Sequence, residues 1–183
     1  MIDVGTKIIE TKRLILRKLE LADASKVYQN WTSDDKVTKY VTWGTHQSIQ
    51  ETIEYINYKL TRYDEKYCYD WVVCIKDTNE PIGEIDAVKV SILNNQVVMG
   101  YCFGSKYWNK GYGTEALSAV IDYLFKEAKV DKVIAYHQVE NTASGRVMQK
   151  SGMHLDATLE NYMIDKTTKK RTGIVMYSID RIK

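Results

Sequence analysis

Two glycines lie in a segment that could hold the phosphates of a cofactor. Residues 107–115 read YWNKGYGTE, and an amphipathic run follows them. Gly111 and Gly113 would let the backbone approach a ligand closely, and a helix starting near Thr114 would offer it unpaired N–H groups and a positive dipole. The β-branched and aromatic run Gln96–Phe103 predicts a strand just upstream. Strand, glycine-rich turn and helix thus follow in the order that a phosphate-binding unit requires.

A second polar motif lies further along the chain, at residues 141–153 (NTASGRVMQKSGM). Asn141 and Ser144 carry hydrogen-bonding groups that could contact a cofactor, while asparagine is also a preferred residue at a helix N-cap. The two glycines alone would equally describe a tight turn that ends a strand. The presence of the second motif favours the cofactor site.

Both motifs resemble those of the GNAT N-acetyltransferases, and within them the branch of ribosomal-protein and N-terminal acetyltransferases (RimJ/RimL-like). Residues 10–17 (ETKRLILR) are similar to that branch's opening strand, and residues 107–116 to its acetyl-CoA loop. The second motif matches at four positions, which are Asn141, Ser144, Lys150 and Gly152. The resemblance covers nearly the whole chain, and it implies acetyl transfer from acetyl-CoA to a primary amine with no need for a metal.

The resemblance also implies which residues hold acetyl-CoA. Backbone amides of one loop would bind the pyrophosphate, with Lys110 available for charge; this loop comprises Trp108, Asn109, Lys110, Gly111, Tyr112, Gly113 and Thr114. Trp108 stands where the wider family has Arg or Gln, a departure that this branch shares. Asn141 would hydrogen-bond the pantetheine arm.

The strand around residues 99–103 is expected to carry the family's β-bulge. Amides exposed there, near Cys102 and Phe103, would bind the pantetheine and polarise the thioester carbonyl. Cys102 itself is interpreted as a small buried residue, because the reaction needs no acyl-cysteine.

Acetyl transfer to an amine requires a base for the amine and a donor for the departing thiolate. Many family members place a tyrosine acid at the position of Met148, so that mechanism is excluded at this site. The RimJ/RimL-like branch has a serine at the position of Ser144, which is expected to donate a hydrogen bond to the leaving sulfur. The alternative is a serine that only stabilises the first helical turn.

Two carboxylates, Glu84 and Asp86, alternate onto one face of a predicted strand beside the central one. Glu84 is the expected base, directly or through water; a solvated carboxylate at the sheet edge is the alternative. Of the isolated histidines, His137 is the next candidate. Freeing a lysine amine at neutral pH costs about 4–5 kcal/mol, whereas an α-amine costs about 1 kcal/mol. A site without an obvious strong base therefore suits an α-amine.

The expected acceptor is the N-terminal α-amine of a protein, such as a ribosomal protein. A small amine (polyamine, aminoglycoside or amino-acid derivative) and a non-catalytic acyl-CoA-binding module remain alternatives. The acceptor is expected between the first two helices and the last hairpin, with four candidates for its walls: Tyr40, Trp43, Tyr67 and Tyr162. Acidic residues common in the family are replaced by Met99 and by Thr172-Gly173. The acceptor therefore does not follow from the resemblance alone.

Composition limits the class of protein. The 183 residues carry 26 basic and 24 acidic side chains, a net charge of +2, which argues against nucleic acid as an obligatory partner. No apolar run reaches transmembrane length, and the N-terminus lacks the apolar core of a signal peptide. The three cysteines show neither CxxC nor Cys/His spacing, so no disulfide framework or zinc site is indicated. A cytoplasmic protein without membrane attachment is expected, and a homodimer is compatible with the sequence.

These groups must be positioned by a single domain, residues 1–183, since no linker, repeat or low-complexity tract interrupts the chain. Periodicity predicts a strand at 7–17, a helix over Leu21–Trp31 and a second helix capped by Ser48. Strands are expected at 69–75, 82–90, 96–103 and 133–137, and a final pair of strands at 153–164 and 171–179. Helices are expected from the glycine loop to 128 and over 142–151. Composition alone indicates an α/β or α+β protein. The resemblance implies the GNAT fold, a mixed, mostly antiparallel sheet with splayed central parallel strands and flanking helices.

Overall fold

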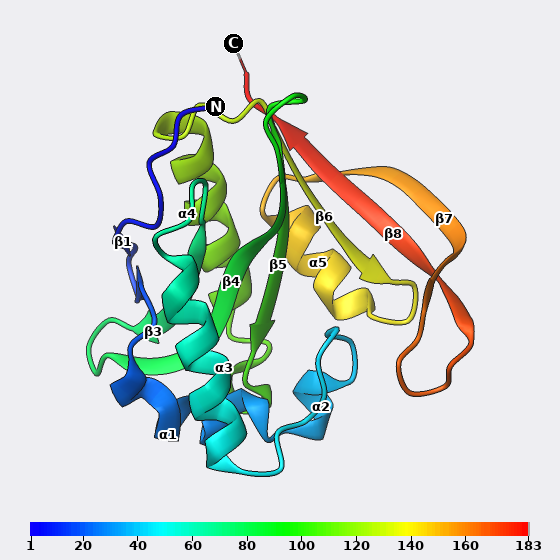
Figure 1. Ribbon diagram of the computed structural model, residues 1–183. Coiled ribbons are helices and arrows are strands. Elements are labelled where there is room, and N and C mark those ends of the chain that lie inside the picture. The colour runs from blue at the N-terminus through cyan, green and yellow to red at the C-terminus, as the bar shows by residue number, and fades with distance from the viewer. Residues whose placement is uncertain (183) are drawn as a thin grey trace.

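The computed structural model describes residues 1–182, which form one eight-stranded sheet flanked by helices (Figure 1). The sheet order is β1-β2-β3-β4-β5-β6-β8-β7, and all neighbours are antiparallel except β5 and β6. The strands are β1 (Ile9–Glu10), β2 (Leu14–Arg17), β3 (Asp70–Ile75), β4 (Glu80–Ser91), β5 (Gln96–Phe103), β6 (Lys132–Gln138), β7 (His154–Ile164) and β8 (Arg171–Asp180). The helices are α1 (Ala24–Val27), α2 (Asp35–Thr38), α3 (Ile49–Arg62), α4 (Tyr112–Lys126) and α5 (Thr142–Lys150).

The expected order of strands and helices is confirmed from β3 to β8, and the N-terminal third differs in detail. The strand expected at 7–17 is split, because Thr11 and Arg13 turn out of the ladder to bind Glu115 of α4. The helix expected over 21–31 consists of consecutive 3₁₀, α and π segments between Leu21 and Thr32. The short helix α2 was not predicted; the side chain of Asp34 caps it by accepting the N–H of Lys36.

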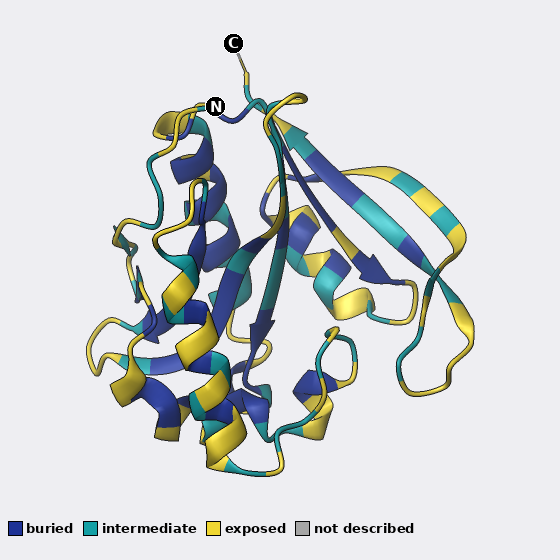
Figure 2. Ribbon diagram, viewed as in Figure 1, coloured by how far each residue is buried: buried dark blue, intermediate teal, exposed yellow. Residues whose placement is uncertain are grey.

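Buried apolar residues form two clusters, one on each face of the sheet, and Figure 2 shows the central strands as largely buried. On one face α4 buries its apolar stripe, which includes Leu117, Val120 and Leu124, against the central strands. On the other face Trp31 and Ile56 pack with Val72 of β3. Helix α3 begins where Ser48 caps it, as expected, by accepting the N–H of Glu51. The sheet thus fixes α4 and α3 on opposite sides of β5.

The parallel strands β5 and β6 separate along their length (Figure 1). They pair only from Gln96–Lys132 to Met99–Ala135; beyond that point β5 pairs with β4 alone and β6 with β8 alone. The sequence placed a bulge within 99–103, and this was wrong. The extra residue is Val88 of β4, between Ala87 (opposite Met99) and Lys89 (opposite Val98). A Cβ on Gly100 would lie 2.9 Å from the Val88 side chain, so the bulge fills the space that this glycine leaves.

Candidate active site

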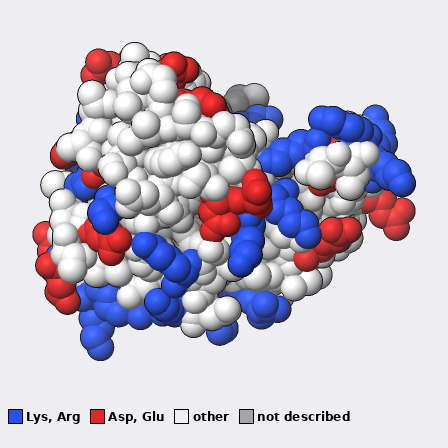
Figure 3. All heavy atoms as spheres, turned by 90° about the horizontal axis from the view of Figure 1, so that it is seen from below, with Lys and Arg blue, Asp and Glu red and all other residues white. Residues whose placement is uncertain are grey.

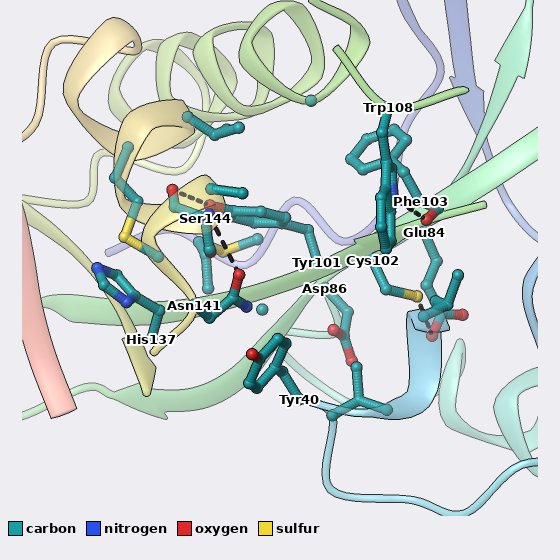
Figure 4. Close-up of a pocket in the computed structure, with 18 of the residues that line it drawn as sticks. Tyr40, Glu84, Asp86, Tyr101, Cys102, Phe103, Trp108, His137, Asn141 and Ser144 are labelled. Carbon is teal, nitrogen blue, oxygen red and sulfur yellow. Dashed lines mark hydrogen bonds between the residues drawn. The ribbon is translucent and has the colours of Figure 1, made fainter. Parts of the chain in front are cut away.

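A cavity of about 820 Å³ lies where β5 and β6 separate (Figure 4). Nearly every residue that the sequence singled out lines it: Glu84, Cys102, Phe103, Trp108, Asn109, Gly111, Tyr112, Gly113, Thr114, Asn141 and Ser144. Lys110 does not line it, and its Nζ lies 5.7 Å from the ring centroid of Tyr107. A phosphate contact from Lys110 therefore stays a prediction.

The glycine loop opens α4 in the manner of an anion site. Gly111 is the N-cap with φ of +80°, a left-handed conformation that favours glycine. The first N–H to bond within the helix is that of Glu115, which donates to the Gly111 carbonyl. The preceding amides of Tyr112, Gly113 and Thr114 therefore lie in the turn whose N–H groups have no partner within a helix. The helix begins at Tyr112, slightly earlier than the expected start near Thr114.

A side-chain brace, which the sequence did not reveal, holds this loop in place. Arg13 donates to the carbonyl of Lys110 at 2.9 Å and pairs with Glu115 at 2.7 Å. Its guanidinium also lies 4.6 Å from the ring centroid of Tyr112. Burial acts to raise the pKa of Glu115, but hydrogen bonds from Thr11 and Arg13 outweigh it and lower that pKa. The turn between β1 and β2 thereby ties down the first turn of α4.

Backbone amides of β5 face the gap between the strands. The N–H of Gly104 donates to Ile82 of β4, and amides alternate in direction along a strand. The amides of Tyr101 and Phe103 therefore point away from β4, into the gap that β6 has left. Trp108 closes the end of this gap, because its indole N–H donates to the Phe103 carbonyl at 2.7 Å. Two donors thus face the gap, about 6.6 Å apart along the strand, and each could bind one acceptor of a thioester ligand.

The first turn of α5 brings Asn141 and Ser144 to the opposite wall. Asn141 caps the helix by accepting the Ser144 N–H at 3.4 Å, so the capping interpretation is correct and coexists with a place in the cavity wall. The Ser144 hydroxyl lies 2.8 Å from the phenol oxygen of Tyr101, a residue that the sequence analysis missed. Strand alternation within 96–103 could have placed Tyr101 on the same face as Met99 and Phe103.

Glu84 lies on the α3 side of the sheet and is only 7% exposed. The alternative of a solvated edge carboxylate is therefore wrong. The phenol of Tyr55 donates to Glu84 Oε2 at 2.5 Å, and the Cys102 thiol lies 3.8 Å from Oε1. Burial raises the pKa of Glu84, although the neighbouring Lys59 acts in the opposite direction. A carboxylate in this state is a better proton acceptor than an ordinary glutamate.

Lys59 of α3 joins three acidic groups beneath the cavity. Its ammonium pairs with Asp70 at 2.8 Å and with Asp86 at 3.1 Å. The charge of Glu84 also favours the charged form of Lys59. Burial disfavours the charged lysine, yet the surrounding carboxylates outweigh this and raise its pKa. This network fixes Asp86 and sets the electrostatics around Glu84.

His137, near the end of β6, is 7% exposed and lines the cavity. Its Nδ1 lies 2.7 Å from the Gln138 carbonyl, which can only accept, so Nδ1 carries the proton. The ring stacks on Tyr177 with centroids 5.9 Å apart. A Cβ on Gly145 would lie 2.5 Å from His137 Nε2, so this glycine lets α5 approach the imidazole.

Of the expected acceptor walls, Tyr40 and Trp43 line the cavity. Tyr67 was wrongly placed: it lies outside the lining, where its N–H bonds the Asp3 carboxylate. Tyr162 is also outside the lining, 51% exposed and packed against Tyr136. The sequence missed two further wall residues on α3, Tyr55 and Tyr58.

Lys166, in the loop between β7 and β8, reaches across to the segment that follows α2. Its ammonium donates to the carbonyls of Thr38 and Trp43, so the hairpin and the acceptor wall are joined. Acidic and basic side chains are interspersed on the face seen from below (Figure 3). That face therefore lacks the single-sign field that an extended polyanion would need.

Within residues 1–182, no cluster of three or more His, Cys, Asp or Glu side chains is arranged to hold a metal ion. The same residues contain no helix with the length and hydropathy of a membrane span. All three cysteines, Cys68, Cys74 and Cys102, are buried free thiols.

Comparison with known proteins agrees with this geometry. The family model for the acetyltransferase (GNAT) domain matches residues 13–154. The chain belongs to the GNAT acetyltransferases. It is 31% identical over 172 residues to YoaA of Bacillus subtilis, named an uncharacterized N-acetyltransferase, covering 94% of this chain and 96% of YoaA. This GNAT protein is therefore an N-acetyltransferase.

Solved structures show the same fold. A GNAT-family acetyltransferase from Bacillus anthracis has a TM-score of 0.84 and 30% identity, covering 96% of this chain and 99% of that one. RimL, the ribosomal L7/L12 alpha-N-protein acetyltransferase in complex with coenzyme A, has a TM-score of 0.83 at 16% identity, covering 95% and 98%. MccE, the microcin C7 self-immunity acetyltransferase in complex with acetyl-CoA and AMP, has a TM-score of 0.80 at 18% identity, covering 93% of this chain and 93% of that one. The last two likenesses concern the fold alone.

Proposed function

We propose that this GNAT enzyme transfers the acetyl group of acetyl-CoA directly to a primary amine, with a protein N-terminal α-amine as the leading acceptor. The observation that carries the proposal is the open gap between β5 and β6, which places free amides of β5 beside the first turn of α4. A thioester needs donors at its carbonyl, and a pyrophosphate needs donors at a helix N-terminus.

The residues present fit acetyl-CoA. The amides of Tyr112, Gly113 and Thr114 would hold the pyrophosphate, and Asn141 the pantetheine arm. Of the amides of Tyr101 and Phe103, one would polarise the carbonyl of the thioester and the other would bind the pantetheine arm. Acetyl-CoA supplies the activated acetyl group; the protein supplies orientation, proton acceptance and charge stabilisation.

Glu84 and Ser144 divide the proton chemistry between the two faces of the sheet. Glu84, held by Tyr55, would accept the proton of the attacking amine, directly or through water. Ser144, on the α5 side, would donate a hydrogen bond to the departing sulfur. The amine would thus lose its proton on one side of the thioester, and the thiolate would leave from the tetrahedral intermediate on the other.

The base supports an α-amine as acceptor. Freeing an α-amine at neutral pH costs about 1 kcal/mol, against about 4–5 kcal/mol for a lysine side chain. A single carboxylate such as Glu84 can meet the smaller cost. The likeness of the fold to RimL, an alpha-N-protein acetyltransferase, points the same way. A ribosomal protein is the first substrate to test.

A small amine is the second candidate, and two observations favour it. Lys166 joins the β7–β8 loop to the carbonyls of Thr38 and Trp43, which narrows the route by which a peptide would enter. Glu84 and Asp86 lie in the cavity lining and would attract an ammonium group, although Lys59, which pairs with Asp86, offsets part of their charge.

Acceptor panels separate the candidates. Release of the CoA thiol is measured with peptides bearing free α-amines, with the same peptides acetylated at the N-terminus, and with small amines. The proposal expects turnover with free N-termini that disappears after N-terminal acetylation. Turnover with small amines only would move the assignment to the second candidate. Binding of acetyl-CoA without turnover in any panel would instead support a non-catalytic acyl-CoA-binding module.

A further inference from the structure

Two hydroxyl groups meet in the cavity wall on the side of α5 (Figure 4). The phenol oxygen of Tyr101 lies 2.8 Å from Ser144 Oγ and 2.9 Å from the Ser144 carbonyl oxygen. Tyr101 belongs to β5 and Ser144 to the first turn of α5, so the contact spans the gap between the separated strands. It is a long-range contact made at the place where acetyl-CoA would lie.

The hydrogen-bond count shows that this pair has two arrangements. A carbonyl can only accept, so when the Tyr101 proton points to the Ser144 carbonyl, the Ser144 hydroxyl must donate to Tyr101. When the Tyr101 proton points to Ser144 Oγ instead, the Ser144 proton is free to turn into the cavity. Only the second arrangement leaves Ser144 with a proton to offer a ligand.

We propose that Tyr101 is a positioning residue for thioester cleavage: its phenol donates to Ser144 Oγ and thereby directs the Ser144 proton at the leaving sulfur. The inference rests on the proposed function, in which Ser144 faces that sulfur. As the amine attacks, the C–N bond forms, the C–S bond breaks and its electron pair leaves with sulfur. The proton of the amine goes to Glu84, and both hydroxyl groups keep theirs.

Physical features of the pair agree with this role. A donor that is itself hydrogen-bonded by a second donor is polarised and bonds its acceptor more strongly. Burial raises the pKa of Tyr101, so the phenol keeps its proton and remains a donor across the working range of pH. A thiolate, unlike a thioester sulfur, is a charged acceptor, so the chain acts mainly on the departing group.

The test uses coenzyme A itself, whose thiolate is the species that the pair would stabilise. The dissociation constant of CoA is measured across the titration of its thiol, about pH 7–10, and the same is done with desulfo-CoA. The difference between the two ligands isolates the bound thiol from other groups lining that wall, namely Glu140, Arg146 and Lys150. Wild type is compared with Y101F, S144A, Y101F/S144A and, as matched control, Y123F, whose phenol donates to the Gly5 carbonyl away from the cavity.

The bound thiol is expected to have a lower pKa than free CoA. Y101F should raise that pKa by about 0.3–1 unit, a 2- to 10-fold loss of bound thiolate, which is what one hydrogen bond provides. S144A should raise it at least as far, and the double variant should equal S144A, because Tyr101 acts only through Ser144. Y123F should match wild type.

Several results would overturn the inference. One is a Y101F effect that persists undiminished in the S144A background, as independent packing would give; another is no effect of Y101F. Loss of CoA binding by Y101F would also contradict it, since the phenol has no part in holding the cofactor. If S144A leaves the thiol unchanged, the proposed role of Ser144 fails as well. Thiol shifts as expected with no amine acetylated would refute the proposed function; of this inference only the hydrogen-bond chain from Tyr101 through Ser144 to the bound sulfur would stand.

Discussion

Replacing Lys59 by methionine should destabilise the fold more than any other charge removal at the site. The Lys59 side chain is 6% exposed and pairs with Asp70, which is 4% exposed, and with Asp86, which is 19% exposed. Methionine has a similar length but no charge, so K59M leaves buried carboxylates without their cation. Breaking a buried pair in this way costs about 3–5 kcal/mol. That is a large part of a total stability of about 5–15 kcal/mol.

Urea unfolding at pH 7 measures the loss in the free energy of unfolding. Thermal unfolding measures it independently: for a chain of this size each 1 kcal/mol lowers the melting temperature by about 2–4 °C, so K59M should lower it by about 6–20 °C. Removing the ammonium raises the pKa of Asp70 further in the folded state. Protonation then relieves the penalty as pH falls, so the loss at pH 5 should be smaller than at pH 7.

Two variants serve as controls for K59M. K59M/D70N also removes the most buried of the carboxylates that pair with Lys59 and should recover at least about 1 kcal/mol. K126M breaks the exposed pair of Lys126 with Asp122 and should cost less than about 0.5 kcal/mol. A K59M protein that loses less than about 1 kcal/mol, or loses as much at pH 5 as at pH 7, would refute the reasoning.

Three further predictions concern the site. G145A places a Cβ 2.5 Å from His137 Nε2 and should lower the free energy of urea unfolding by about 1–3 kcal/mol. The control G44A, with open space around the added Cβ, should change it little. Equal effects of the two variants would contradict the clash. G111A imposes φ of +80° on alanine and should weaken acetyl-CoA binding in calorimetry by about 10-fold, from strain of about 1–2 kcal/mol; unchanged affinity would contradict the loop's role. E84Q should lower kcat/KM at neutral pH by about 10²–10⁴-fold. In wild type the rate should fall with acid through a limb above about pH 4.3, because burial raises the pKa of Glu84, and a limb that survives in E84Q would exclude this base.

Local patterns in the sequence predicted most of the fold. Strands β3 to β8 and helices α3 to α5 follow from hydrophobic periodicity, caps and turn residues, all of which act over a few neighbours. The separation of β5 and β6 came from the family resemblance instead. The split between β1 and β2 could not be predicted, because it depends on the contact of Thr11 and Arg13 with the distant Glu115.

The candidate site divides in the same way. The glycine loop and the α5 motif are each one continuous segment of the sequence, so the residues of each that face the cavity could be named in advance. Tyr101 beside Ser144, and Lys59 beneath Glu84, are pairings across elements that spacing does not encode. Burial of Glu84 also depends on α3 covering it, through Tyr55. Which face of a strand a residue occupies was readable; what covers that face was not.

The most direct test of the account counts both products of one reaction. Wild-type protein is given acetyl-CoA and a peptide with a free N-terminus; released CoA thiol and acetylated peptide are quantified together, with E84Q run in parallel. The account predicts one acetylated α-amine for each thiol, and in E84Q an equal loss of both products with acetyl-CoA binding retained. Thiol release without acetylated amine, or full acetylation by E84Q, would contradict direct transfer to an amine assisted by Glu84.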